Sequence, residues 1–276
     1  MVALTGGSEE REPDDGAEGP GPLLVVTPAE LELLEDAHAA HLGLEGPAGG
    51  PADGQGQGRP PARGRAGRTE ALRSLQGRGV LDAQARLVAG SAVADLVLVL
   101  LDVRVSAQAL LVVERRLAGS EHQADLRLLH LVESGGVVED LHPQGWHALD
   151  LCLEPAELAD RALEPMLPPD AAPGGGEPIT LDTGDPDPST ARLSASVLAE
   201  LTLVRPDGRP EASVLLAVGE RGCHLAHRED LDEATRRGSG ALVFTPVAPD
   251  TVRELVRGWV RRVVTPADPD GPTLVR

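Results

Sequence analysis

The feature that most constrains this fold is a module of three parts: an apolar run, a proline, and an acid-rich helix start. Two copies are "LCLEPAELADRALEPML" at 151–167 and "FTPVAPDTVRELVRGWV" at 244–260, and "LLVVTPAELELL" at 23–34 repeats the order. Proline suits the first position of a helix, where no backbone N–H is needed. We therefore predict that Pro155 and Pro249 begin helices, and that the repetition serves architecture rather than catalysis.

In the first half of the chain, strand patterns precede the module. Residues 103–113 alternate with period two, which places one set of side chains on a common face: Val103, Val105, Ala107, Ala109, Leu111 and Val113. The polar turn "LAGSEHQ" at 117–123 leads into a second strand pattern from 124. We read Gly135–Gly136 as a turn and expect a third strand near 146–153.

The second half has the same order of elements. "SVLAELTLVR" and "EASVLLAVGERGCHLAHR" flank a "PDGRP" turn, and "GALVFTPV" follows as a third strand before the last helix. A three-stranded meander has an open edge and a face to cover. The sequence therefore predicts an α+β protein in which two strand-strand-strand-helix halves form one quasi-two-fold central antiparallel sheet, flanked by helical bundles.

The expected organisation follows from these patterns. Thr27 and Glu30 form a capping-box pattern, which favours a helix start there. The boundaries that we expect are a tail at 1–22, a first half at 23–167 with a Gly/Pro/Arg-rich flexible insertion at 45–68, a linker at 168–189, a second half at 190–264 and a tail at 265–276.

Charge and composition exclude several function classes. The net charge of −19 argues against binding to nucleic acid, and three aromatic residues provide no stacking platform for bases. The first 22 residues lack the pattern of a signal peptide, and the longest apolar run is too short to span a membrane. With two cysteines, Cys152 and Cys223, in apolar surroundings, we expect buried thiols in a cytoplasmic protein.

One motif suggests hydrolysis. "ITLDTGD" at 179–185 contains Asp-Thr-Gly, the core of an aspartic-protease loop, with Asp182 as its carboxylate. That chemistry needs two such carboxylates sharing a proton, and this sequence has one copy, in a Pro/Gly-rich stretch. An Asp-Gly turn is the reading we prefer.

A second pattern suggests a metal. "CHLAH" contains Cys223, His224 and His227, but the two histidines would point to opposite faces of a strand, whereas zinc needs three or four converging ligands. The other histidines weighed as ligands are His122, His130, His142 and His147. We predict no catalytic residue, no metal and no cofactor. A hydrolase or metal enzyme using Asp182 or the histidines remains an alternative, as does a non-catalytic scaffold.

Four stretches together resemble the EspG family across about 23–264. They are "TPAELELL", "LRSLQGRGVLDAQARLVAGSAVADLVLVLLDVRVSAQALLVVERR", "WHALDLCLEPAELADRALEPMLPP" and "GALVFTPVAPDTVRELVRGWVRRV". The resemblance implies a quasi-two-fold α+β fold with a central antiparallel sheet and helical bundles. It also implies a non-enzymatic, cytoplasmic, actinobacterial chaperone of type VII (ESX) secretion, which binds the apolar helical tip of a PPE-like protein in a PE–PPE pair.

The resemblance also suggests where such a partner binds. In the family a strand–strand loop and the C-terminal helical region hold the substrate. The residues at these positions are Gly119, Ser120, Glu121 and His122 in the turn, and Trp259 in the last helix. Tryptophan is a frequent hot-spot residue at interfaces, but a core position is the reading we prefer for Trp259, so the turn is the stronger candidate.

Overall fold

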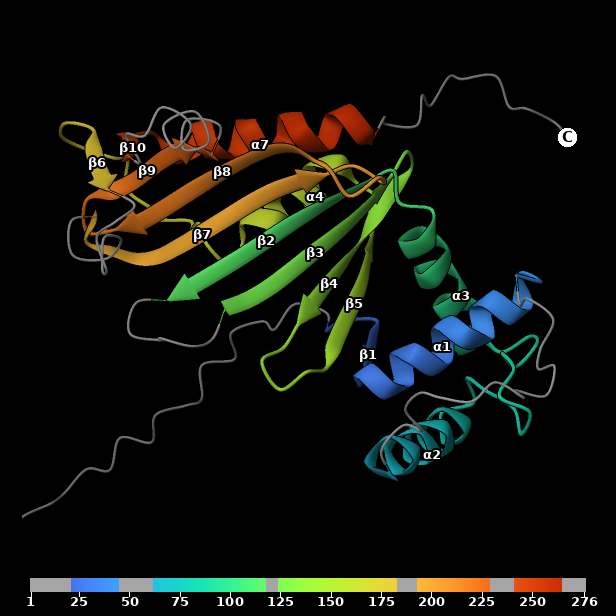
Figure 1. Ribbon diagram of the computed structural model, residues 1–276. Helices are drawn as coiled ribbons and strands as arrows, with labels where there is room; N and C mark the ends of the chain where they lie inside the picture. The colour runs from blue at the N-terminus through green and yellow to red at the C-terminus, as the bar shows by residue number, and fades with distance from the viewer. Residues whose placement is uncertain (1–20, 45–61, 118–123, 183–192, 229–240, 265–276) are drawn as a thin grey trace, which may run out of the picture.

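The computed structural model describes residues 21–44, 62–117, 124–182, 193–228 and 241–264. Within these residues the strands form one ten-stranded sheet in the order β1-β5-β4-β3-β2-β7-β8-β9-β10-β6 (Figure 1). Every neighbouring pair in that order is antiparallel. The predicted α+β fold with a central antiparallel sheet is confirmed.

The bounds of the elements are as follows. The helices are α1 Pro28–His41, α2 Ala62–Gly77, α3 Ala92–Val105, α4 Pro155–Leu163 and α7 Pro249–Val263. The strands are β1 Leu24–Val26, β2 Ala109–Leu117, β3 Ala124–Val132, β4 Gly135–Leu141, β5 His147–Cys152, β6 Ile179–Asp182, β7 Ala195–Val204, β8 Pro210–Gly219, β9 Gly222–His227 and β10 Ala241–Pro246.

The sheet has a quasi-two-fold arrangement about the β2–β7 pair. From this centre β3, β4 and β5 follow on one side, and β8, β9 and β10 follow on the other. Each half then ends in a helix, α4 or α7. Four consecutive strands therefore precede each of these helices, one more than the three predicted, and β1 and β6 add a fifth strand at each edge of the sheet.

The extra strand in the first half begins at Gly135–Gly136, which we expected to be a turn. The turn lies directly before the two glycines, at 133–134, and Gly135 and Gly136 are the first two residues of β4. A Cβ on Gly136 would lie 2.7 Å from the carbonyl oxygen of His130, so the glycine allows the strands to approach. In the second half, a turn at 220–221 divides the expected single strand into β8 and β9.

The two module helices cover one face of the sheet. Pro155 and Pro249 stand in the first turns of α4 and α7, as predicted. Both helices lie behind the sheet in the view of Figure 1 and contact each other. The side chains of Leu158 and Val252 lie in one apolar cluster with Leu201 of the central strand β7. The halves therefore share one core on this face.

The first three helices cover the opposite face near β4 and β5. On β4, Val138 faces the cluster under α4 and α7, whereas Val137 faces a second cluster with residues of α1, α2 and α3. The start of α1 has the predicted capping box. The backbone N–H of Thr27 donates to Glu30 Oε2 at 2.8 Å, and the backbone N–H of Glu30 donates to Thr27 Oγ1 at 3.3 Å.

Two boundaries differ from the sequence-based expectation. Helix α3 continues to Val105, and β2 begins at Ala109, so the expected strand at 103–105 is wrong. An apolar run rich in valine fits a helix as well as a strand. Here Ser91 caps the N-terminus of α3, and the helix continues through the valines. Helix α2 begins at Ala62, inside the expected insertion at 45–68. No helix in the described part of the chain is long and apolar enough to cross a membrane.

Candidate functional site

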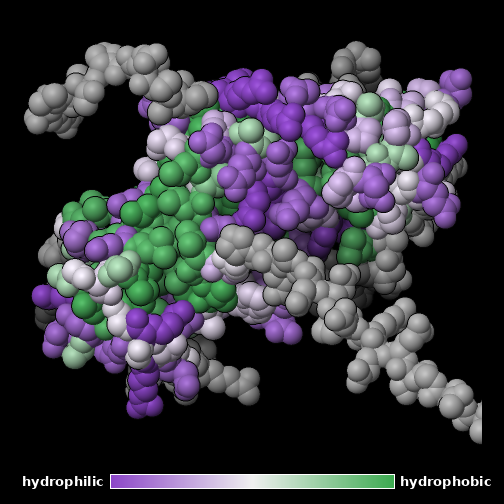
Figure 2. Space-filling view, turned by 180° about the vertical axis from the view of Figure 1, so that it is seen from behind, coloured by the Kyte–Doolittle hydropathy of each residue, from purple (hydrophilic) through white to green (hydrophobic). Residues whose placement is uncertain are grey.

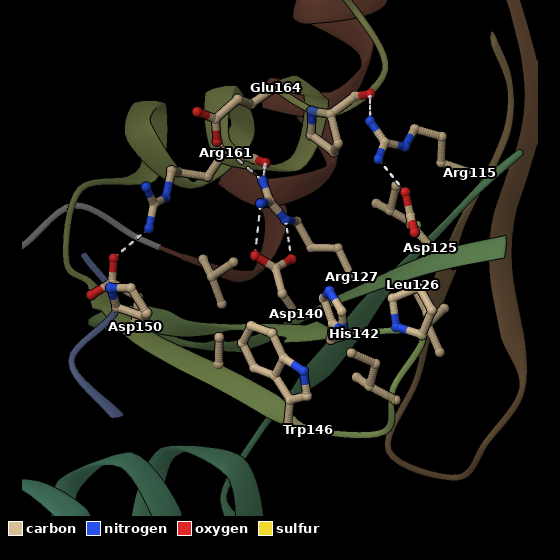
Figure 3. A pocket seen from close by; sticks show the side chains of 17 residues that line it. Arg115, Asp125, Leu126, Arg127, Asp140, His142, Trp146, Asp150, Arg161 and Glu164 are labelled. Atoms are coloured by element: carbon tan, nitrogen blue, oxygen red, sulfur yellow. Dashed lines mark hydrogen bonds and ion pairs between the residues drawn. The ribbon is translucent and has the colours of Figure 1, made fainter. Parts of the chain in front are cut away.

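A groove of about 640 Å³ lies beside α4, on the face of the sheet that α4 covers (Figure 3). Strands β2 to β5 form its floor, and the C-terminal end of α4 forms a wall. The apolar part of the lining includes Val113 and Val138 from the floor, with Leu126 and Leu141. The groove is therefore amphipathic, because charged side chains alternate with these apolar ones.

Three arginine–aspartate pairs line the groove (Figure 3). They are Arg115 with Asp125, Arg127 with Asp140, and Arg161 with Asp150. Arg127 and Asp140 are direct cross-strand neighbours on β3 and β4. Their contact is bidentate, from Nε to Oδ1 at 2.5 Å and from Nη2 to Oδ2 at 2.8 Å, the strongest geometry for such a pair.

Two of these arginines also hold the end of α4. Arg127 Nη1 donates to the backbone oxygen of Arg161, and Arg115 Nη1 donates to that of Pro165 at 2.6 Å. The last carbonyls of a helix lack intrahelical donors, and a cation there also favours the helix dipole. Burial opposes the charge of Arg127, but its hydrogen bonds to Asp140 outweigh burial and raise its pKa. These charges therefore fasten α4 to the sheet.

Some hydrogen-bonding capacity is left over in the groove. The Nε atoms of Arg115 and Arg161 are buried and have no hydrogen-bond partner in the described part of the chain. Buried donors of this kind are uncommon in proteins. Both arginines line the groove, and a carbonyl or carboxylate oxygen is the kind of group that such a donor would bind.

The β4–β5 hairpin supplies an aromatic rim. The rings of His142 and Trp146 stack with their centroids 4.2 Å apart, and the backbone N–H of His142 donates to the oxygen of Trp146 at 2.9 Å. Trp146 is half-buried, so part of its ring remains accessible at the groove. A large flat ring of this kind gives much apolar contact area.

Two groove residues lie close in sequence to the turn predicted to bind a partner. Arg115 and Asp125 lie near the ends of β2 and β3, the two strands that this turn connects. The predicted contact residues Gly119, Ser120, Glu121 and His122 themselves lie outside the described residues.

Trp259 is 4% exposed and belongs to the core cluster beneath α7. Its burial fits the alternative that the sequence left open, a core side chain. It does not line the groove. Trp146 is the tryptophan that does, and we did not single it out from the sequence.

The other sequence candidates do not form a site in the described part of the chain. Asp182 ends the edge strand β6, where it pairs with Ala241, and the rest of its motif lies outside the described residues. No group of three or more His, Cys, Asp or Glu side chains is placed to hold a metal ion in the described residues. Cys223 and His224 are buried in β9, while His227 is exposed. Burial raises the pKa of Cys223, and it raises that of Cys152 to about 11, so neither thiol is a ready nucleophile.

The opposite face of the sheet contains a charged cluster that sequence reasoning missed. Glu139, on β4, is 1% exposed and contacts Arg104 Nε at 3.0 Å, His130 Nε2 at 2.8 Å and His147 Nδ1 at 2.6 Å. Arg104 also donates to Glu35 of α1 at 2.7 Å. Burial alone would raise the pKa of Glu139, but the hydrogen bond with His130, the charge of Arg104 and the hydrogen bond with His147 lower it to about 2. The cluster joins α1 and α3 to the sheet.

Comparison with known proteins gave matches among solved structures. No family model matches the sequence, and no curated protein is similar to it. Among solved structures, the chain is similar to the Mycobacterium tuberculosis type VII secretion system chaperone EspG5, determined in complex with a PE25–PPE41 dimer. The TM-score is 0.49 and the identity 10%, over 88% of this chain and 97% of that chain. This level of similarity does not establish a family or a function.

Proposed function

We propose that this protein is a non-enzymatic adaptor that holds a helical segment of a partner protein in the groove beside α4 and against the 118–123 turn. The observation that carries the proposal is the groove itself. It combines an apolar floor, paired charges, two buried unpaired donors and an aromatic rim.

The chemistry of the lining favours recognition over catalysis. Enzyme sites bring together a nucleophile, a base and groups that stabilise developing charge. Here the guanidinium groups are already bound to aspartates and to helix carbonyls. Because each arginine charge is balanced by an aspartate, the groove offers a rigid surface against which a row of side chains of the partner helix can pack. The unpaired Nε–H of Arg161 would then donate to a backbone carbonyl or an acidic side chain of the partner.

The sequence resemblance suggests the class of partner. The EspG-like stretches imply a type VII secretion chaperone, so we propose a PE–PPE-like substrate whose apolar helical tip enters the groove. In that role the protein acts in the cytoplasm, before secretion, and needs no cofactor.

The test is a binding measurement with purified PE–PPE heterodimers from the same genome. Two changes should weaken binding at least tenfold: Trp146→Ala at the groove rim, and a shortened turn lacking Gly119–His122. Calorimetric titration measures the Kd, and thermal melting confirms that each variant is folded.

A matched control alters the "PDGRP" turn between β7 and β8 in the same way. That turn lies at the other end of the sheet, because β7 runs antiparallel to β2. It should leave the Kd unchanged. A wild-type protein that binds none of the heterodimers would exclude the secretion-chaperone role, and equal binding by the Trp146→Ala variant would exclude the groove.

A further inference from the structure

Helix α3 presents an apolar seam to solvent. Ala92, Leu96, Val99 and Val103 follow one another at spacings of four, three and four, so they lie on one side of the helix. Val99 is 44% exposed, Ala92 is exposed, and Leu96 and Val103 are half-buried. Figure 2 shows a continuous hydrophobic area over this part of the molecule.

Only part of the seam helps to hold α3 in the fold: Leu96 and Val103 are half-buried against the cluster shared with α1 and α2, whereas Ala92 and Val99 are exposed. The opposite side of the helix already supplies buried contacts through Val97, Leu100 and Leu101. Arg104 points to the same inner side, where it meets Glu139. A second apolar face on a helix that is already anchored is typical of an interaction surface.

One flank of the seam is acidic. Asp95 and Asp102 each stand one position before a seam residue, Leu96 or Val103, which is the place where paired helices carry their partner-selecting charges. Asp95 is exposed, and the Asp102 side chain is 58% exposed while one of its oxygens contacts His38 Nε2 at 2.6 Å. The other flank faces the protein.

We propose that this seam binds an amphipathic helix of a partner protein, one with an apolar face at three- and four-residue spacing and with arginine or lysine beside that face. The apolar rows would interlock as in a coiled coil, and the basic flank would meet Asp95 and Asp102.

A second copy of this chain fits the seam poorly. Antiparallel pairing of two α3 helices would set these aspartates against each other.

The seam is separate from the groove. Helix α3 packs on the face of the sheet opposite to the one that α4 and the groove occupy. The proposal does not depend on the proposed function, and together the two surfaces would let the protein link two partners.

The test uses the full-length protein and two designed 21-residue helical peptides. Both carry leucine at the seam positions; one has arginine on the flanks and the other glutamate. Fluorescence anisotropy should show binding of the arginine peptide and at least tenfold weaker binding of the glutamate peptide. Val99→Asp should weaken binding of the arginine peptide at least tenfold. Because this change adds negative charge, non-specific attraction to an acidic protein would instead strengthen binding.

Two variants complete the design. Val105→Asp is the matched control: Val105 is on the same helix and 67% exposed but lies off the seam, so its change should alter binding less than twofold. Asp95→Arg should reduce or reverse the preference for the arginine peptide. If Val99→Asp shifts the melting curve, Val99→Ser repeats the test without a new charge.

Three results would overturn the proposal. One is an arginine peptide that does not bind the wild-type protein. Another is that Val99→Asp leaves binding of the arginine peptide unchanged, or that Asp95→Arg leaves the preference for that peptide unchanged. The third is a wild-type dimer in sedimentation that Val99→Asp dissociates, which would assign the seam to a second copy.

Discussion

At Glu139 a single carboxylate joins two strand histidines to an arginine of α3. Replacing it with glutamine would remove the buried counter-charge of Arg104 and leave only the half-exposed carboxylate of Glu35 beside it, and breaking a buried pair costs about 3–5 kcal/mol. We expect Glu139→Gln to lower the free energy of unfolding by about 3 kcal/mol in urea at pH 7. Glu114→Gln, on the same face but more exposed, is the control and should change it by less than about 0.5 kcal/mol. Equal effects would show that the cluster contributes no special stability.

The same residue predicts a pH dependence. The pKa of Glu139 is lowered from 4.5 to about 2 in the folded protein. Its contribution to stability is therefore complete above about pH 4.5 and is lost as the pH falls towards 2. The difference in unfolding free energy between the wild type and Glu139→Gln should shrink over this range, as a urea series at several pH values can measure. A difference that stays constant down to pH 2 would contradict the role assigned to this carboxylate.

Asp182 is expected to do no chemistry. Its single Asp-Thr-Gly motif lacks the second carboxylate that proteolysis requires. Purified protein should leave denatured casein uncleaved at pH 4 and at pH 7. Cleavage that disappears in Asp182→Asn would reverse this conclusion.

The residue scale also shows the limits of the sequence. The capping box at Thr27 was predictable because both partners lie within three residues. The surroundings of Glu139 were not, because its partners come from three other elements and no strand was predicted at the position of β4. Trp146 was missed as a groove residue for the same reason: its place depends on the β4–β5 hairpin.

At the scale of elements, close approach between β4 and its neighbours explains the two glycines. Gly136→Ala would place a Cβ 2.7 Å from the His130 oxygen and 3.2 Å from the Leu158 side chain. We expect a loss of about 2 kcal/mol or more in chemical unfolding. Gly258→Ala in α7 is the control, because no atom lies within 4 Å of its Cβ and alanine favours a helix. That variant should gain about 0.5–1 kcal/mol.

The helix modules were the most predictable elements. Proline position and apolar periodicity placed α4 and α7 correctly, since both signals are local. Strand number was less predictable. The run 211–228 was read as one strand although Gly219 and Gly222 flank its turn, and Gly222 has a positive φ of 78° there. The end of α3 was missed because valine-rich sequence suits either element.

For the whole molecule, the shared core implies that neither half is complete alone. Leu111 and Leu129 of the first half pack in the same cluster as Leu201 and Leu216 of the second. A fragment covering 1–182 would expose this surface together with the unpaired edge of β2. We expect it to lack a cooperative melting transition alone and to regain one when mixed with a fragment covering 183–276. Cooperative melting of the isolated fragment as a monomer would contradict a single shared core.

The pairing of β2 with β7 also has a consequence during protein synthesis. Val113 pairs with Leu201, so the centre of the sheet cannot close until most of the chain has left the ribosome. At about 5–20 residues per second, β2 waits several seconds for its partner. Long-range pairing of this kind slows folding because the loop must close before the contacts form. Each nascent chain therefore passes through an interval in which its central strand is available to the wrong neighbour.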